Sequence, residues 1–248
     1  MKALILNSGM GRRMGDLTSK YPKCMTKISE EETILSRQLK LLHQCGISDI
    51  VITTGFFDEV LVKYCGSLDL SLKYTFVKNP IYDKTNYIYS IYTAREYLYD
   101  DILLLHGDLV FELCVLQDLL KQHNSCMAVS STVPLSPKDF KAVIKDGLIQ
   151  KIGVEFFSDA VAAQPLYKIY RQDWEVWLDR IIIYCENGQV QCYAEDAFNE
   201  ISHRCLIYPM DFMDHLCAEI DTPEDLLLIK AKLSYIGRDR ERRRERIL

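Results

Sequence analysis

Short apolar runs alternate along the chain with segments whose apolar positions repeat at helical spacing. Residues 3–6 (ALIL) and 49–53 (DIVIT) have the apolar character of buried parallel strands. Residues 33–45, between them, carry apolar side chains at roughly helical spacing, and Gly46 follows as a typical helix end. This order of strand, helix and strand predicts a βαβ unit at the start of the chain.

The rest of the chain continues the alternation. We predict further helices at 57–65, 86–98, 174–186 and 226–233, and further strands at 72–77, 102–105, 128–133, 140–144 and 148–152. Asp146-Gly147 predicts a hairpin turn, and Thr222-Pro223 is a typical start for the last helix. We therefore expect a Rossmann-like α/β fold, with a mixed, mostly parallel sheet and helices on both faces. One domain should cover residues 1–235, followed by a charged tail at 236–248.

Composition and charge narrow the class of partner. The 248 residues carry a formal net charge of −5, which argues against binding to nucleic acid or to an anionic membrane surface. No apolar run approaches the roughly 20 residues that a membrane span needs. The nine cysteines form no CxxC pair, which indicates reduced thiols and a cytoplasmic protein.

The loop after the first strand, residues 7–23 (NSGMGRRMGDLTSKYPK), concentrates glycine and positive charge. Glycines allow the backbone to approach a phosphate closely, while arginine and lysine side chains neutralise its oxygens. In open α/β sheets, ligands bind beyond the carboxyl ends of the strands, which is where this loop lies. The loop therefore predicts a polyphosphate site; the alternative is a basic surface turn without a ligand.

Two common phosphate-binding motifs do not fit this loop. The P-loop string GxxxxGK[ST] is absent, and the glycines follow the spacing GxGxxxG instead of the dinucleotide pattern GxGxxG. The acidic residue that holds a cofactor ribose is also missing, because Thr53-Thr54-Gly55 closes the second strand. An NAD(P)-binding oxidoreductase is thus the less favoured alternative, and the cations Arg12, Arg13 and Lys23 favour a triphosphate.

Four motifs, in order along the chain, resemble those of nucleotidyltransferases that activate sugar phosphates and phosphocholine. They are GMGRRM with Tyr21-Pro22-Lys23, then Asn86-Tyr87-Ile88-Tyr89-Ser90, His106-Gly107-Asp108 and Glu219-Ile220-Asp221-Thr222. The stretch NPIYDKTNYIYSIY and the segment 195–199 (EDAFN) are most similar to the branch of CTP:phosphocholine and 2-aminoethylphosphonate cytidylyltransferases. The chain departs from the family pattern in two ways: Asn7-Ser8 replaces Ala-Ala, and Tyr87 stands where some members have a second asparagine.

The resemblance implies the fold of nucleotide-diphospho-sugar transferases and a reaction. CMP would pass from CTP to a small cationic phosphate or phosphonate, namely phosphocholine or 2-aminoethylphosphonate, with release of pyrophosphate and with Mg²⁺ as cofactor. Because the attacking oxygen is already anionic, catalysis should rest on positioning and electrostatics, with no general base. A nucleotidyltransferase for a sugar or polyol phosphate is the alternative in the same class. A catalytically inactive regulatory homologue is a further one, although Lys23 and both motif aspartates are present.

The resemblance also implies roles for individual residues. Lys23 and Arg13 would be catalytic, and Asp108 and Asp221 would hold Mg²⁺. The nucleotide would be bound by Asn7, Ser8, Gly9, Gly11, Asn86 and Ser90.

A cationic acceptor group calls for aromatic faces or carboxylates. The candidate acceptor residues are Glu195, Asp196, Tyr167 and Tyr193. The alternative for the Glu-Asp pair is that it caps a helix beginning near Ala197. Trp174 and Trp177 share a helical stripe with Ile181 and Tyr184, so we predict that both tryptophans pack in the core.

Overall fold

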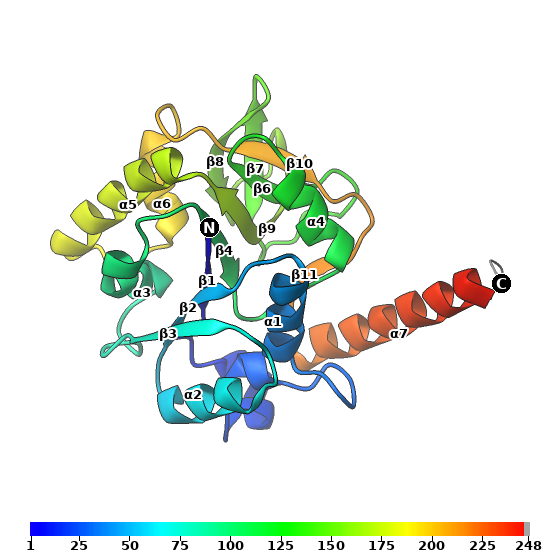
Figure 1. Ribbon diagram of the computed structural model, residues 1–248. Helices are drawn as coiled ribbons and strands as arrows, with labels where there is room; N and C mark the ends of the chain where they lie inside the picture. The colour runs from blue at the N-terminus through cyan, green and yellow to red at the C-terminus, as the bar shows by residue number, and fades with distance from the viewer. Residues whose placement is uncertain (246–248) are drawn as a thin grey trace.

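A nine-stranded mixed sheet forms the centre of the molecule, with helices on both faces (Figure 1). The computed structural model describes the backbone of residues 1–245 and the side chains of residues 1–238. Along the sheet the order is β10-β6-β9-β4-β1-β2-β3, and the β7–β8 hairpin joins through β9. These strands are β1 Lys2–Leu6, β2 Asp49–Thr54, β3 Lys73–Lys78, β4 Ile102–His106, β6 Cys126–Ser130, β7 Lys141–Lys145, β8 Leu148–Gly153, β9 Ala160–Ile169 and β10 Tyr208–Asp211.

Two helical layers cover the sheet, each with its own apolar core. The helices are α1 Ile34–Gln44, α2 Asp58–Ser67, α3 Tyr87–Ala94, α4 Leu113–Lys121, α5 Arg171–Glu186, α6 Ala194–Ile201 and α7 Pro223–Glu245. Successive side chains of β1 point to opposite faces: Ala3 and Ile5 pack with α1, α2 and α4, while Leu4 and Leu6 pack with α3, α5 and α6. This explains why β1 reads as a continuous apolar run.

The predicted α/β fold is confirmed, and each predicted strand and helix is present. Thr33 begins α1 as a capping residue, because its Oγ1 accepts a hydrogen bond from the Ser36 amide at 3.0 Å, and Gly46 follows the helix with φ +78°. Asp146 and Gly147 form the β7–β8 turn, both with positive φ. The last helix is much longer than predicted, since α7 continues to Glu245.

The central strand β9 was not predicted. It runs antiparallel to both β4 and β6, although the sequence AVAAQPLYKI lacks the usual strand pattern. Pro165 has no N–H for a ladder, and the β6–β9 register shifts between Met127 and Val129, opposite this part of the strand. The irregularity therefore accommodates the proline that obscured the strand in the sequence.

A separate two-stranded ribbon, β5 (Leu109–Phe111) and β11 (Cys217–Glu219), joins two distant parts of the chain. The Ile220 amide donates to the Asp108 carbonyl at 3.0 Å, and at the other end the Glu112 amide donates to the Leu216 carbonyl at 2.9 Å. The ribbon thereby holds the segment after β4 beside the segment before α7. It is the reason why Asp108 and Asp221 meet.

Helix α7 begins directly after Asp221 and projects from the body of the molecule (Figure 1). A reciprocal cap fixes its start: Asp225 Oδ2 accepts from the Thr222 amide at 2.9 Å, and Thr222 Oγ1 accepts from the Asp225 amide at 3.2 Å. The helix passes without a break through the expected boundary between residues 235 and 236. Most side chains of the predicted charged tail lie outside the described residues.

None of the helices within the described residues is long and apolar enough to cross a membrane. All nine cysteines are free thiols, and three of them, Cys45, Cys114 and Cys192, are partly exposed.

Trp174 and Trp177 both lie fully buried on α5, in the core that α5 shares with Tyr167 and Phe198. The prediction that they pack in the core is confirmed. Trp177 Nε1 donates to the Ala194 carbonyl at 2.8 Å, whereas Trp174 Nε1 has no hydrogen-bond partner among the described residues. The two tryptophans therefore form a matched pair that differs in one hydrogen bond.

We predict that Trp177→Phe lowers the free energy of unfolding by about 1 kcal/mol more than Trp174→Phe, since only the first substitution removes a hydrogen bond that is made in the folded protein. Urea denaturation of both variants measures the difference. Equal losses would show that the Trp177 hydrogen bond contributes nothing net.

Candidate active site

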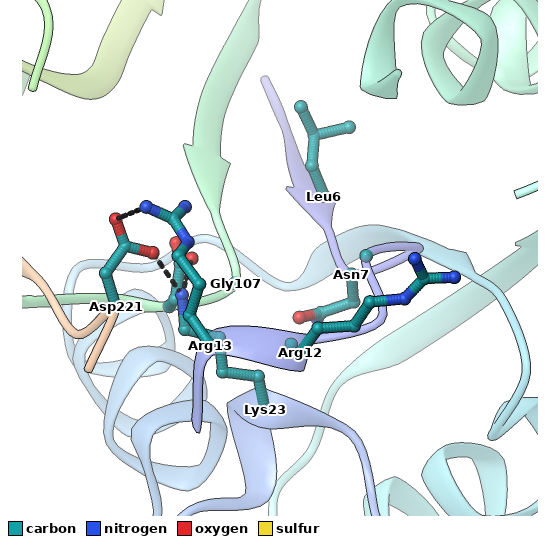
Figure 2. Close-up of a pocket in the computed structure, with 10 residues that line it drawn as sticks. Leu6, Asn7, Arg12, Arg13, Lys23, Gly107 and Asp221 are labelled. Atoms are coloured by element: carbon teal, nitrogen blue, oxygen red, sulfur yellow. Dashed lines mark hydrogen bonds and ion pairs between the residues drawn. The ribbon is translucent and has the colours of Figure 1, made fainter. Parts of the chain in front are cut away.

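A cavity of about 230 Å³ opens at the carboxyl ends of β1 and β4, where the glycine-rich loop begins (Figure 2). Gly11 adopts φ +61°, and a Cβ there would lie 3.2 Å from the Cβ of Lys23. A glycine at this position therefore lets the start of the loop lie against Lys23. The cavity is lined by Leu6, Asn7, Gly9, Gly11, Arg12, Arg13, Lys23, Gly107, Asp108 and Asp221.

Asn7 closes the end of the cavity between β1 and β4. The backbone N–H of Asn7 donates to the Thr53 carbonyl at 3.2 Å, and this hydrogen bond joins the loop to β2. A Cβ on Gly107 would lie 1.6 Å from Asn7 Oδ1, so a side chain there would displace the Asn7 amide group. The glycine in the His106-Gly107-Asp108 motif thus provides space for the asparagine.

The ammonium of Lys23 lies at the centre of the site and joins two carboxylates. Its Nζ is 2.6 Å from Asp108 Oδ2 and 2.6 Å from Asp221 Oδ1. Arg13 Nη1 lies 3.1 Å from Asp221 Oδ2, as the dashed contacts in Figure 2 show. The side chains of Lys23 and Asp221 are only 14% and 9% exposed, so both charges are largely removed from water. Three segments far apart in the sequence are linked by this one cation.

Mutual attraction keeps these buried groups charged. Burial alone would lower the pKa of the Lys23 ammonium, but Asp108 and Asp221 outweigh burial, and the pKa is raised. Burial would likewise raise the pKa of the Asp108 carboxyl, but Lys23 and then His106 outweigh it, and the pKa is lowered. Ammonium and carboxylate are therefore both ionised at neutral pH.

A second ion pair lies behind the first and was not assigned from the sequence. His106 Nδ1 is 3.0 Å from Glu219 Oε1. Burial, followed by the nearby Asp108 charge, raises the pKa of the Glu219 carboxyl to about 7. Burial would lower the pKa of the His106 ring, but the contact with Glu219 outweighs it, and the pKa is raised. His106 and Glu219 each lie two positions before a predicted aspartate, in the same motif. This position in the motif was the feature of the sequence that could have identified them.

The donor set fits a magnesium ion. Asp108 Oδ1 is buried without a hydrogen-bond partner among the described residues, so one carboxylate oxygen has unused acceptor capacity. Ligand atoms of His106, Asp108 and Glu219 also lie within 4.8 Å of one another. Carboxylate oxygens are the protein ligands that Mg²⁺ prefers.

A second cavity, of about 170 Å³, shares Leu6, Gly9 and Asp108 with the first. It brings the predicted nucleotide residues Ser8, Asn86 and Ser90 beside the loop. Its other lining residues are Asn79, Tyr82, Thr85, Tyr87 and His106.

Asn79, which the sequence analysis missed, organises this second cavity. It is buried, and its Nδ2 donates to Ser90 Oγ at 3.0 Å and to Thr85 Oγ1 at 2.9 Å. Asn86 caps α3, because its Oδ1 accepts from the Tyr87 amide at 2.8 Å. The segment 79–90 is thus held by its own polar side chains.

The predicted acceptor residues separate into two groups. Glu195 is 1% exposed, and its carboxylate accepts hydrogen bonds from the hydroxyls of Tyr87 and Tyr167, the latter at 2.7 Å. Tyr167 is fully buried and packs edge-on against Trp177. Tyr167 is therefore a core residue that orients Glu195, while Tyr87 connects Glu195 to the second cavity.

Asp196 has the capping role that was the alternative interpretation. Its Oδ2 accepts from the Tyr193 amide at 2.8 Å, and α6 begins at Ala194, three residues before the expected start. The cap holds Tyr193 at the first turn of α6, where the Tyr193 side chain is 36% exposed.

Four aromatic rings, those of Tyr87, His106, Phe140 and Tyr193, form an aromatic wall beside Asp108. Tyr87 is 4.7 Å from the His106 ring and 5.9 Å from the Tyr193 ring, and Tyr193 is 5.1 Å from Phe140. Glu195 binds Tyr87 and Glu219 binds His106, so two carboxylates lie behind the rings. The wall combines π faces with nearby negative charge.

Arg12, in contrast, makes no contact with either aspartate in the described residues. Its Nη2 donates to Met10 Sδ at 3.3 Å, and its side chain is exposed at the edge of the first cavity. This arrangement agrees with the choice of Arg13 as the residue of the site.

Residues 3–196 match the model of the MobA-like NTP transferase domain. The chain belongs to this family. The match covers the glycine-rich loop, Lys23, Asp108 and the aromatic wall, and the resemblance inferred from the sequence motifs is confirmed.

Part of this chain is similar in sequence to several other proteins. It is 34% identical over 137 residues to CMP-5'-(3-aminopropyl)phosphonate synthase of Streptomyces rubellomurinus, covering 55% of this chain and 22% of that protein. It is 27% identical over 154 residues to CTP:phosphoglutamine cytidylyltransferase of Campylobacter jejuni, covering 59% of each. It is 29% identical over 125 residues to choline-phosphate cytidylyltransferase of Streptococcus pneumoniae, covering 49% and 51%. The chain thus spans less than two thirds of each relative.

Solved structures confirm the fold over nearly the whole chain. CTP:phosphocholine cytidylyltransferase from Streptococcus pneumoniae superposes with a TM-score of 0.76 at 20% identity, covering 94% of this chain and 98% of that one. The inositol-1-phosphate CTP transferase from T. maritima superposes with a TM-score of 0.74 at 19% identity, covering 93% and 95%. The MobA-like chain therefore has the nucleotidyltransferase fold.

The Lys23 bridge generates a prediction about stability. Without magnesium, Lys23→Ala leaves Asp108 and Asp221 facing each other, and we expect it to cost about 1–3 kcal/mol of unfolding free energy, since the pair is largely but not fully buried. Asp108→Asn should destabilise the parent but stabilise the Lys23→Ala variant, because it then removes a repulsion. Urea denaturation in a chelating buffer measures all four proteins.

The control is Lys121→Ala, which removes an exposed partner of Asp118 at 2.8 Å and should cost less than about 0.5 kcal/mol. An Asp108→Asn effect of the same sign and size in both backgrounds would mean that Lys23 and Asp108 are energetically independent.

Proposed function

We propose that this protein is a cytidylyltransferase that transfers CMP from CTP to a small cationic phosphate or phosphonate. The observation that carries the proposal is the Lys23 ammonium, 2.6 Å from both Asp108 and Asp221, beside a glycine-rich loop. Negative charge accumulates when two phosphates react, and a buried ammonium with an arginine nearby would stabilise it.

The proposed reaction is one in-line displacement. An anionic oxygen of the acceptor phosphate or phosphonate forms a bond to the α-phosphorus of CTP. The bond from that phosphorus to the oxygen bridging to the β-phosphate breaks, and pyrophosphate leaves with the electron pair. No proton has to move, so a site without a general base is adequate.

Two cations of the chain have distinct parts in this step. Lys23 would bind the α-phosphate and the incoming anion, which lowers the repulsion between them. Arg13, on the exposed side of Asp221, would bind the β- and γ-phosphate oxygens as the leaving group forms. Gly9 and Gly11 would allow backbone N–H groups to face the triphosphate.

Asp108 and Asp221 would hold Mg²⁺, which when bound neutralises phosphate charge and orients the phosphates. In the structure both carboxylates bind Lys23. Binding of the nucleotide would therefore let Lys23 exchange carboxylate contacts for phosphate contacts.

The choice of CTP rests on relatives and on the second cavity. The names of the Streptomyces, Campylobacter and Streptococcus relatives describe CMP or cytidylyl transfer to a phosphorylated or phosphono compound. In this chain Ser8, Asn86 and Ser90 line a cavity that adjoins the glycine-rich loop. Their hydroxyl and amide groups offer donors and acceptors for a base and a ribose.

The aromatic wall supports a cationic acceptor. A substrate ammonium over the rings of Tyr87 or Tyr193 would gain cation–π attraction, and Glu195 and Glu219 behind the rings would add to it. A primary ammonium can also donate hydrogen bonds, which a trimethylammonium cannot. Phosphocholine and 2-aminoethylphosphonate both place such a cation a few bonds from the attacking oxygen.

A sugar phosphate acceptor is the second candidate, and one relative favours it. The chain is 27% identical over 144 residues to D-glycero-alpha-D-manno-heptose 1-phosphate guanylyltransferase of Aneurinibacillus thermoaerophilus, covering 57% of this chain and 60% of that protein. The carboxylates behind the aromatic wall argue for the cationic acceptor instead.

Pyrophosphate release tests the proposal, with CTP, UTP, GTP and ATP against phosphocholine, 2-aminoethylphosphonate and glucose 1-phosphate in the presence of Mg²⁺. We expect turnover with CTP and a cationic acceptor. The matched control is 3,3-dimethylbutyl phosphate, which replaces the choline nitrogen by carbon. Its kcat/KM should be at least about tenfold lower than that of phosphocholine, since a desolvated cation–π contact is worth about 2 kcal/mol.

Equal kcat/KM for the charged and neutral acceptors would contradict the role of the aromatic wall. Preference for glucose 1-phosphate would favour the second candidate. No pyrophosphate with any pair would contradict nucleotidyl transfer itself.

A further inference from the structure

A cluster of potential metal ligands lies at the end of the β5–β11 ribbon away from the active site. Glu112 follows β5, Cys114 lies in the first turn of α4, and His215 precedes β11. The ligand atoms of these three side chains all lie within 4.8 Å of one another. None of the three lines either cavity of the candidate active site.

The contacts within the cluster converge on one nitrogen. Cys114 Sγ is 3.5 Å from His215 Nδ1, and Glu112 Oε2 is 3.4 Å from the same Nδ1. A catalytic relay would place the thiol and the carboxylate on opposite nitrogens of the ring, so that one accepts a proton while the other is oriented. A sulfur, an oxygen and a nitrogen ligand atom gathered within 4.8 Å of one another are instead compatible with a shared metal ion.

The spacings agree with tetrahedral zinc. Zinc binds sulfur at about 2.3 Å and nitrogen or oxygen at about 2.0–2.2 Å. At a tetrahedral angle those bond lengths place a sulfur ligand about 3.5–3.6 Å from a nitrogen ligand, and a nitrogen about 3.3–3.5 Å from an oxygen. The two distances to His215 Nδ1, 3.5 Å from the sulfur and 3.4 Å from the oxygen, lie within these ranges.

The surroundings of the cluster suit a bound ion. The Leu216 amide donates to Glu112 Oε2 at 2.9 Å and fixes the carboxylate next to His215. The His215 side chain is 50% exposed, so an ion can enter from solvent. The same exposure of His215 lets solvent supply a water as fourth ligand.

We propose that Glu112, Cys114 and His215 form a Zn²⁺ site with one open coordination position. The mixed set of thiolate, imidazole and carboxylate is the ligand chemistry of zinc and differs from the oxygen ligands of magnesium.

A bound ion would cross-link the two strands of the ribbon at one end. Glu112 lies four residues after Asp108, and His215 lies six residues before Asp221. An ion that joins Glu112 and Cys114 to His215 fixes the far end of the ribbon whose near end presents the two aspartates. Zinc binding should therefore stabilise the fold independently of nucleotide or magnesium.

The test measures metal binding by the full chain after treatment with a chelator. Zn²⁺ is titrated in competition with a chromophoric chelator, in excess Mg²⁺, and Co²⁺ is used to detect a thiolate-to-metal absorption band. We expect one Zn²⁺ per chain, a higher Tm with Zn²⁺, and a thiolate band with Co²⁺. Because the readouts are binding and stability, the result does not depend on the proposed reaction.

Cys114→Ser and His215→Ala should each weaken Zn²⁺ binding by at least about tenfold, because loss of a group that merely orients a ligand already costs about 10–100-fold. The matched controls are Cys45→Ser, which changes another partly exposed thiol, and His43→Ala, which changes an exposed histidine on α1. Both controls should bind Zn²⁺ as the parent does, and circular dichroism confirms folding of all variants.

Three results would overturn the proposal. The first is no bound Zn²⁺ in the parent. The second is unchanged binding by Cys114→Ser and His215→Ala, which would place the ion elsewhere, for example at His106, Asp108 and Glu219. The third is an equal loss in the Cys45 and His43 controls.

Discussion

The placement of one ammonium group between two carboxylates is the constraint on which the rest of this structure depends. Asp108 and Asp221 are 113 positions apart in the sequence, and the ribbon brings them to the same nitrogen of Lys23. Two unscreened carboxylates so close in a poorly hydrated site would repel each other strongly. The glycine-rich loop must therefore fold over them to supply the cation. The ribbon brings the two carboxylates together, and the loop supplies the cation that neutralises them.

The proposed function brings anions to these same three groups. Lys23, Asp108 and Asp221 are already gathered and charged, and in the proposed function nucleotide binding would exchange the contacts among them for contacts to phosphate. Nearby, the aromatic wall is fixed by buried contacts, with Tyr87 bound to Glu195 and His106 bound to Glu219. The proposed phosphate site and the aromatic wall thus lie side by side, because the cavities that they line share Leu6, Gly9 and Asp108. In the proposed function, that pairing would favour a small zwitterionic acceptor over a sugar phosphate, whose sugar carries no cation.

The sequence predicted those features that depend on local pattern. The apolar runs of β1, β2 and β4, the glycine-rich loop and the two motif aspartates could all be recognised from neighbouring residues. Strand β9 could not, because Pro165 interrupts its pattern and its partners lie far away in sequence. Nor could the sequence decide between Glu195, buried by two tyrosines, and Asp196, one position on and used as a helix cap. Tertiary contacts alone separate these two adjacent acids.

The most direct test of the central claim is kcat/KM for CTP in the Lys23→Ala variant, measured by pyrophosphate release with a saturating acceptor. The account predicts a fall of roughly 10²–10³, the range typical of one preorganised electrostatic group, in a protein that remains folded. A folded Lys23→Ala variant with near-parent kcat/KM would contradict it, since the shared cation would then have no part in the chemistry.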